Sequence, residues 1–171
     1  MKKLFLYMTM LMAAMTLTTG CSSSDDDTDS EDNRLKFANA LTRNSLSTAW
    51  EGNNTAFYKE LGNWVNKGSE YVVMQFNRSA TTATNGTGVV LIFANDYKNR
   101  FEDKSNFRWS FDNDQLMISY ENPEWDGMHA EYRTNELKIE GNQFYGYWYI
   151  RTDKRYQFNY KPSTFSDWSR Y

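Results

Sequence analysis

The chain has 171 residues, a formal net charge of −3 at pH 7, one cysteine and one histidine. This length suits a single domain with a sizeable core, and the lone cysteine excludes both an internal disulfide and a multi-thiolate metal site. Lysine and arginine side chains form no stripe along the sequence, so we expect no nucleic-acid partner.

The chain begins with the pattern of an export signal. Lys2 and Lys3 give a positive start, residues 4–17 are apolar, and small residues precede Cys21. The apolar stretch is too short for a transmembrane helix, which needs about 20 apolar residues. The sequence Leu-Thr-Thr-Gly-Cys at 17–21 resembles a bacterial lipobox. The resemblance implies that residues 1–20 are a signal peptide and that Cys21 is acylated.

Residues 21–33 are a candidate tether between the lipid and the folded domain. The segment after Cys21 has no apolar residue and carries six acids: Asp25, Asp26, Asp27, Asp29, Glu31 and Asp32. It cannot bury apolar surface and its like charges repel, so we expect an extended, disordered tether.

The tether is either a plain spacer or a sorting signal. Serines and acids directly behind a lipidated cysteine resemble the surface-export signal of some Gram-negative lipoproteins. Several acyl chains hold a protein on a membrane far more firmly than one chain does. We therefore expect a lipid anchor in the outer membrane, with the protein facing the cell surface or, alternatively, the periplasm.

Residues 34–47 are the only plausible helix of the mature chain. Leu35, Ala38 and Leu41 fall near one face, and Asn33 or the aspartate before it can cap the first turn. The apolar stripe is thin, so we expect a short N-terminal helix that leans on a larger structure.

From Trp50 onward, apolar and polar residues alternate with the period of β-strands. The alternating segments are residues 71–76, 88–93, 107–112, 116–121, 137–139, 144–150 and 156–161, of which 88–93 is apolar on both faces. Turns and loops are expected at 79–87, Asn113-Asp114, 122–127, Gly141-Asn142 and 151–154. Eight or nine short antiparallel strands of this kind predict an up-and-down barrel or a sandwich.

Several landmarks follow one another along the chain: Trp50-Glu51-Gly52 after the helix, Gly86-Thr87-Gly88-Val89, the paired segments 107–111 and 116–120, then 137–142 and Tyr145-Gly146. This order resembles a lipocalin-like lipoprotein domain over about residues 41–161. The resemblance implies that residues 34–171 have an all-β fold, an eight-stranded antiparallel up-and-down barrel with a short N-terminal helix and a cup-shaped interior. The chain departs from secreted lipocalins in lacking disulfides and their Gly-x-Trp opening.

Aromatic residues make up 17% of the chain and are the candidates for ligand contact, because their rings can stack on sugars or line an apolar pocket. The candidate ligand-binding residues are Trp109, Tyr120, Trp125, Tyr145, Tyr147 and Tyr149. Alternatively, rings simply fill an eight-stranded barrel, which has little more than side-chain room: Phe107, Trp109, Phe111, Trp148 and Phe158. The tyrosines at 145, 147 and 149 lie on the face opposite Trp148 and either cover the helix or form a contact surface.

The candidate residues for metal binding and catalysis are less well supported than the aromatic residues are for ligand contact. His129 and Glu131 share a strand face, but zinc takes three or four protein ligands, and His129 is the only imidazole. Carboxylate pairs for hydrolysis could come from Glu121, Glu131 and the loop acids Glu124 and Asp126, yet acids around a loop are usually solvated. We therefore expect no metal, no cofactor and no enzyme activity.

The sequence thus predicts a membrane-anchored envelope lipoprotein whose barrel binds a small apolar molecule or a glycan non-covalently. One alternative is a filled barrel that contacts a neighbouring envelope protein through its outer face. Another alternative is a carboxylate-based hydrolase. A cavity in the barrel interior favours ligand binding, whereas an interior plugged by Trp109, Phe158 and their neighbours favours the protein-contact role.

Overall fold

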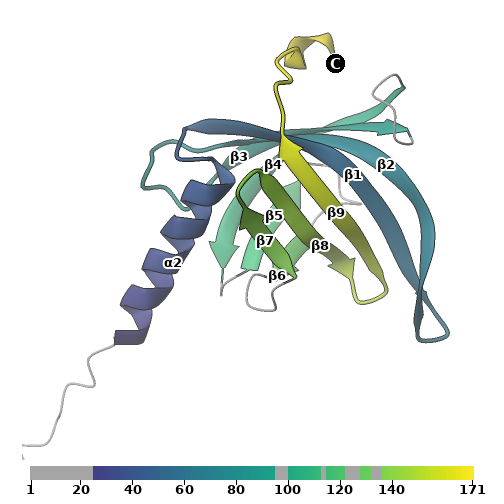
Figure 1. Ribbon diagram of the computed structural model, residues 1–171, viewed down its shortest axis with the longest axis horizontal. Coiled ribbons are helices and arrows are strands. Elements are labelled where there is room, and N and C mark those ends of the chain that lie inside the picture. Colours follow the sequence, from purple (N-terminus) through teal and green to yellow (C-terminus); the bar gives the residue numbers. More distant parts are fainter. Residues whose placement is uncertain (1–24, 95–99, 113–114, 122–127, 132–135) are drawn as a thin grey trace, which may run out of the picture.

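The computed structural model describes residues 25–94, 100–112, 115–121, 128–131 and 136–171. Within these residues the chain forms one α-helix, nine β-strands and a terminal 3-10 helix (Figure 1). The elements are α2 (Asp25–Leu41), β1 (Ser47–Glu60), β2 (Asn63–Asn77), β3 (Asn85–Ala94), β4 (Phe101–Asp112), β5 (Gln115–Tyr120), β6 (Met128–Glu131), β7 (Leu137–Glu140), β8 (Gln143–Arg151), β9 (Lys154–Pro162) and η1 (Trp168–Arg170). No helix in the described part of the chain is long and apolar enough to cross a membrane.

All nine strands join one antiparallel sheet in the order β6-β5-β4-β3-β2-β1-β9-β8-β7. The sheet curls strongly, as Figure 1 shows, and its edge strand β6 also pairs with β8 through His129 and Tyr149. The prediction is confirmed for the antiparallel strands, the curled, barrel-like sheet and the single short N-terminal helix. The turns at Gly141-Asn142 and 151–154 are confirmed, and β4 and β5 pair up to Asp112 and Gln115 on either side of the predicted Asn113-Asp114 turn.

The sheet has nine strands, which agrees with the eight or nine predicted from the alternation and exceeds the eight that the lipocalin-like resemblance implies. β7 pairs with β8 from Gln143 to Gly146, and β6 pairs with β8 further along, at Tyr149. β6 and β7 are four residues each. They therefore lie one after the other along the same edge of β8, and two short strands occupy the place expected for one.

The helix differs from its prediction at both ends. α2 begins at Asp25 and ends at Leu41, so residues 25–33 are helical rather than an extended tether. Acidic residues suit the first turn of a helix, whose unpaired N–H groups carry partial positive charge. The helix ends early because Arg43 and Asn44 adopt positive φ angles of 52° and 57°, which lets β1 begin at Ser47.

The buried side of α2 packs into one end of the sheet's interior. Phe37, Ala38 and Leu41 are buried in the same cluster as the inward-facing residues of the strands. The Phe37 ring meets Phe111 edge-on at 4.7 Å between ring centroids, and the Leu41 carbonyl accepts a hydrogen bond of 2.8 Å from Trp50 Nε1. We call this region the helix end of the interior.

Aromatic rings fill most of the interior, from the helix end to the strands further from the helix. The five rings expected to fill the interior, Phe107, Trp109, Phe111, Trp148 and Phe158, are all buried, so that prediction is confirmed. Trp148 stacks on Phe158 at 4.8 Å, and Phe144 meets both Phe158 and Trp50 edge-on at 4.9 and 5.5 Å. Such pairs stabilise the fold beyond the burial of their apolar area.

A second apolar cluster lies on the outside of the sheet, where β3 is apolar on both faces. Val73, Leu91 and Phe93 are covered by the C-terminal segment 163–171 through Phe165, Trp168 and Tyr171. This segment crosses the sheet near β1 and carries η1 beyond it (Figure 1). Sequence reasoning found the two apolar faces of β3 but no cover for the outer one.

Candidate functional site

The residues predicted to bind a ligand lie in different parts of the molecule. Trp109 and Tyr120 are buried on the inner side of the sheet, whereas the tyrosines of β8 lie on its outer side and are half-buried. Trp125 lies outside the described residues. The structure therefore does not gather the five predicted residues that it describes into one pocket.

Trp109 is held as a core residue. Its ring is 2% exposed, and its Nε1 donates hydrogen bonds of 3.1 and 3.2 Å to the carbonyls of Asn77 and Thr87. Phe76 and Phe111 meet the ring edge-on. Its one polar atom is satisfied by the backbone, which is what a buried indole needs for stability.

A different set of side chains forms the most developed polar site, at the end of the interior away from the helix. On β1, the side chains of Trp50 and Asn54 point inward. On β2, Phe76 points inward near the helix, and Glu70 points inward at the far end. β9 adds the phenol rings of Tyr156 and Tyr160. We call Asn54, Glu70, Tyr156 and Tyr160 the polar cup.

Hydrogen bonds order the polar cup. The Tyr160 hydroxyl donates to Asn54 Oδ1, and Asn54 Nδ2 donates to Glu70 Oε1 at 3.3 Å. Asn54 is only 4% exposed, so its amide is fixed at both ends by protein partners. The chain of three groups leaves the second carboxylate oxygen of Glu70 as a further acceptor, since an ionised carboxylate has about four acceptor positions.

A cavity of about 330 Å³ opens above the polar cup, lined by Asn54, Ala56, Lys67, Gly68, Ser69, Glu70, Ala94, Arg100, Glu102 and Tyr156. It forms where β2 extends beyond β3, because those strands pair only from Tyr71 to Asn77. Ligand pockets commonly measure about 300–1,000 Å³, so this one suits a small ligand.

Burial sets the charge state of the polar cup. Desolvation raises the pKa of Glu70 above its ordinary value, although the Asn54 hydrogen bond and the nearby Lys154 ammonium act in the opposite direction. Burial also raises the pKa values of Tyr156 and Tyr160, and the Glu70 charge adds to the effect. Tyr120 has its pKa raised by burial and by these neighbours, so this predicted ligand residue lies close to the cup. These phenols stay neutral at pH 7 and can both donate and accept hydrogen bonds.

Cationic side chains stand around the polar cup. The Lys154 ammonium lies over the rings of Tyr58 and Tyr156, at 5.3 and 5.4 Å from their centroids. Lys67 pairs with Glu60. Arg100 and Glu102 are exposed where they line the cavity, so both charge signs are represented at its mouth.

Sequence reasoning missed the polar cup because it began the β2 alternation only at residue 71. The alternation extends further back, since Glu70 is in phase with the inward-facing Val72, Met74 and Phe76. A carboxylate in phase with an apolar row is costly to bury and is a candidate functional residue. That signal was present in the sequence.

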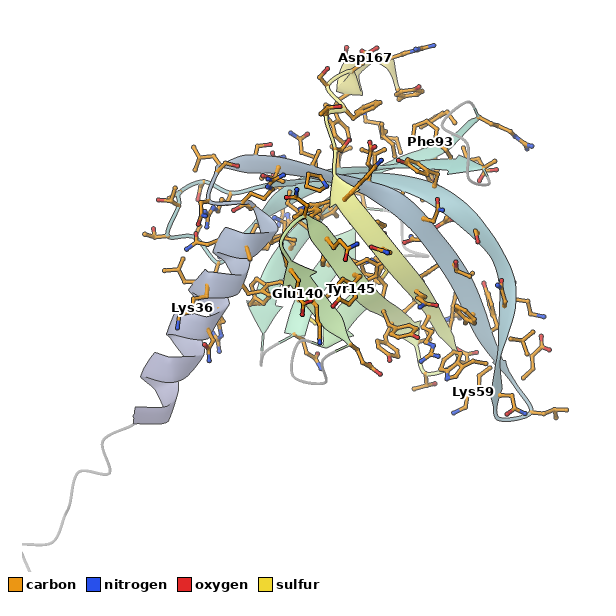
Figure 2. All side chains as sticks on the ribbon, viewed as in Figure 1. Lys36, Lys59, Phe93, Glu140, Tyr145 and Asp167 are labelled. Atoms are coloured by element: carbon orange, nitrogen blue, oxygen red, sulfur yellow. The ribbon has the colours of Figure 1, made fainter. Side chains whose placement is uncertain are left out.

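The outer tyrosines are held by polar neighbours and do not cover the helix. The Tyr145 hydroxyl donates to Glu140 at 3.0 Å, and Figure 2 shows these two side chains together on the sheet. The Tyr149 hydroxyl donates to Glu136. Because the buried residues of α2 join the interior cluster instead, the expectation that these tyrosines cover the helix is wrong.

The predicted metal and acid candidates are dispersed or outside the described residues. The Glu121 side chain is exposed and accepts a 3.0 Å hydrogen bond from Asn106 Nδ2. The loop acids Glu124 and Asp126 lie outside the described residues, as do the side chains of His129 and Glu131. Across the described ranges, no group of three or more potential metal-ligating side chains is found.

Comparisons with known proteins assign no family to the chain. No protein-family model matches it, and no curated protein matches it. Function is therefore inferred from the polar cup and the outer face of the sheet.

Proposed function

We propose that this protein is a lipid-anchored envelope lipoprotein that binds a small, polar, sugar-like ligand in the polar cup. The observation that carries the proposal is the hydrogen-bonded chain Tyr160–Asn54–Glu70 at the floor of a cavity of about 330 Å³. A lipocalin-like barrel with one open end is the architecture in which such a cup would serve binding.

The residue types favour a glycan over an apolar molecule. Rings fill the helix end, whereas the open cavity is lined mostly by polar groups: two carboxylates, two cations, an amide, a hydroxyl and a phenol. Leaving such groups desolvated without partners costs about 1–3 kcal/mol each, so an apolar ligand would be penalised here. Vicinal hydroxyl groups of a sugar can bond Glu70 and Asn54, while its C–H face packs on the Tyr156 ring.

The lipid anchor supports a location on the outer membrane, facing the cell surface. Cys21 follows a signal-like segment, and an acidic serine-rich segment follows Cys21. We expect Cys21→Ala to move the protein from the membrane to the soluble fraction, because several acyl chains supply the anchoring energy. Ser22→Ala is the matched control and stays with the membrane. Membrane retention of Cys21→Ala would contradict the anchor.

Calorimetric titration of the full chain tests the cup. Glucose, galactose, N-acetylglucosamine and palmitate are the probes, in a detergent without a sugar headgroup. We expect saturable binding of at least one sugar, weakened about tenfold or more by Asn54→Leu, since a hydrogen bond to a charged or buried group contributes about 1.5–3 kcal/mol. Ser166→Ala, an exposed residue away from the cavity, is the control. Binding of palmitate alone, or sugar binding unaffected by Asn54→Leu, would contradict the proposal.

The same samples separate binding from hydrolysis. Glu70, with its raised pKa, and Glu102 line one cavity, and carboxylate pairs perform glycoside hydrolysis in other proteins. We expect oligosaccharides incubated with the protein to remain intact by mass spectrometry. Release of shorter sugars that is lost in Glu70→Gln would replace the binding role with a hydrolase role.

A further inference from the structure

β8 and β9 carry a regular ladder of tyrosine and polar side chains on their outer faces. Because these strands pair antiparallel, each tyrosine lies opposite a polar residue: Tyr145 opposite Asn159, Tyr147 opposite Gln157, and Tyr149 opposite Arg155. We call these six residues the tyrosine–amide ladder. It lies on the opposite side of the sheet from Trp148 and Phe158, and so from the interior.

A surface groove of about 380 Å³ runs over the ladder, lined by Glu136, Gln143, Tyr145, Gly146, Tyr147, Gln157, Phe158 and Asn159. Gly146 lets the chain before β7 approach closely, since a Cβ there would lie 1.8 Å from the Glu136 carbonyl oxygen. Its φ of 149° also suits glycine. The close approach brings Glu136 to the side of the groove.

The tyrosine rings of the ladder are positioned before any ligand arrives. Glu140 holds the Tyr145 hydroxyl, and Glu136 holds the Tyr149 hydroxyl. The Arg155 guanidinium lies 4.2 Å from the Tyr147 ring centroid and 4.3 Å from that of Trp64. The rings are thus fixed by contacts at the surface while remaining half-exposed. Fixed rings lose little conformational entropy when they bind a ligand.

The amides beside these rings are available for hydrogen bonding. Gln143, Gln157 and Asn159 are exposed, and no protein group in the described part of the chain bonds their side-chain amides. Each amide offers two N–H donors and a carbonyl acceptor. Vicinal hydroxyl groups need this mixture of donors and acceptors at the edge of an aromatic surface.

The charges around the groove are already engaged. Glu140 lies 3.8 Å from the Lys138 ammonium and accepts from Tyr145. Glu136 accepts from Tyr149, and Arg155 lies between two aromatic rings. The two carboxylates are balanced by two cations, and the carboxylates at the groove's edge would repel an anion, which favours a neutral ligand over an anionic one.

We infer that the groove over the tyrosine–amide ladder binds a neutral oligosaccharide. The C–H faces of its sugar rings pack on Tyr145 and Tyr147, whose ring faces carry partial negative charge. Its hydroxyl groups exchange hydrogen bonds with Gln157 and Asn159. This site is independent of the polar cup, because the two lie on opposite sides of the sheet.

An array of neutral and anionic glycans, probed with the full chain in a sugar-free detergent, tests the inference. We expect neutral oligosaccharides to be retained and anionic ones not. In titrations with the best neutral glycan, Tyr147→Ala should weaken binding about tenfold or more, while Tyr147→Phe keeps the ring and the affinity. Asn54→Leu, in the polar cup, should leave this affinity unchanged.

A double variant covers the case in which Tyr147→Ala disturbs folding. Gln157→Ala with Asn159→Ala changes only exposed side chains, and it should weaken binding by a similar factor while the thermal melt stays the same. An array silent for neutral glycans, or full affinity in the double variant, overturns the inference. Loss of affinity in Asn54→Leu alone places the glycan in the polar cup, which overturns the outer site and leaves the proposed function standing.

Discussion

The two ends of the sheet's interior are built from the same strands but differ in their side chains. The helix end is apolar, and the polar cup consists of hydrogen-bonding groups. β1 presents Trp50 to the helix end and Asn54 to the polar cup, and β2 presents Phe76 and Glu70 in the same way. The helix end is packed with rings, whereas the cup is a chain of hydrogen bonds below an open cavity. One continuous strand can therefore supply stability at one end and a binding site at the other.

Removing a ring from the helix end should have the largest effect. Trp109→Ala loses buried apolar area and leaves two backbone carbonyls without their indole donor. We expect a loss of about 3–5 kcal/mol in the free energy of unfolding, measured by urea denaturation. A near-neutral result would mean that Trp109 faces a ligand space and that the two ends are alike.

Removing a ring from the outer cover should have a smaller effect. Phe165 is half-buried, meets Trp168 at 5.0 Å and packs over the outer face of β3. Phe165→Ala should cost about 1.5–3 kcal/mol in the same denaturation experiment. Ser166→Ala, an exposed neighbour, should change stability by less than about 0.5 kcal/mol. Equal effects of the two substitutions would show that the C-terminal segment does not cover the sheet.

Changing the charge in the polar cup should alter how stability depends on pH. Because burial raises the pKa of Glu70 above 4.5, the folded protein holds this proton more tightly than the unfolded chain. The resulting stability is fully present below pH 4.5 and is lost as the pH rises through the raised pKa. Glu70→Gln should therefore be more stable than the parent at neutral pH and equal to it in acid.

Thermal melts of both proteins across this pH range measure the effect. The amide oxygen introduced by Glu70→Gln can still accept the Asn54 hydrogen bond, so the substitution isolates the charge. Melting curves that differ by the same amount at every pH would show that Glu70 is not desolvated. The polar cup would then be ordinary surface.

The smallest effect is expected at the tip of the β1–β2 hairpin. Lys67 pairs with Glu60, and both side chains are about half exposed, at 41% and 52%. Lys67→Ala should change the free energy of unfolding by less than about 1 kcal/mol, because water screens such pairs. A larger loss by urea denaturation would mean that the cup end carries stability as the helix end does.

Strand alternation was enough to predict the sheet and the aromatic residues that fill its interior. The inward phase of Phe107, Trp109 and Phe111 is plain in the sequence, and so is the outward phase of the β8 tyrosines. Pairing between distant segments was not predictable in this way. The covering of β3 by the C-terminal segment, and the placing of Glu70 beside Tyr160, depend on contacts between residues far apart in the chain.

The helix boundaries show a different limit of sequence reasoning. Charge repulsion predicted an extended segment at 25–33, but the structure places these residues in α2. The favourable interaction of acids with a helix N-terminus and the repulsion between acids oppose each other, and composition alone does not say which is stronger. The early stop at Leu41 depends on positive φ angles at Arg43 and Asn44, residues that carry no glycine signal.

A titration followed by nuclear magnetic resonance compares the two ends most directly. Two-dimensional ¹H–¹⁵N spectra of the full chain resolve the side-chain amide of Asn54 and the indole groups of Trp50 and Trp109, which bond the backbone near the helix. On addition of glucose, galactose or N-acetylglucosamine, we expect at least one sugar to shift the Asn54 signals and to leave both indole signals in place. Indole shifts without an Asn54 shift, or no Asn54 shift with any of the three sugars, would contradict the account.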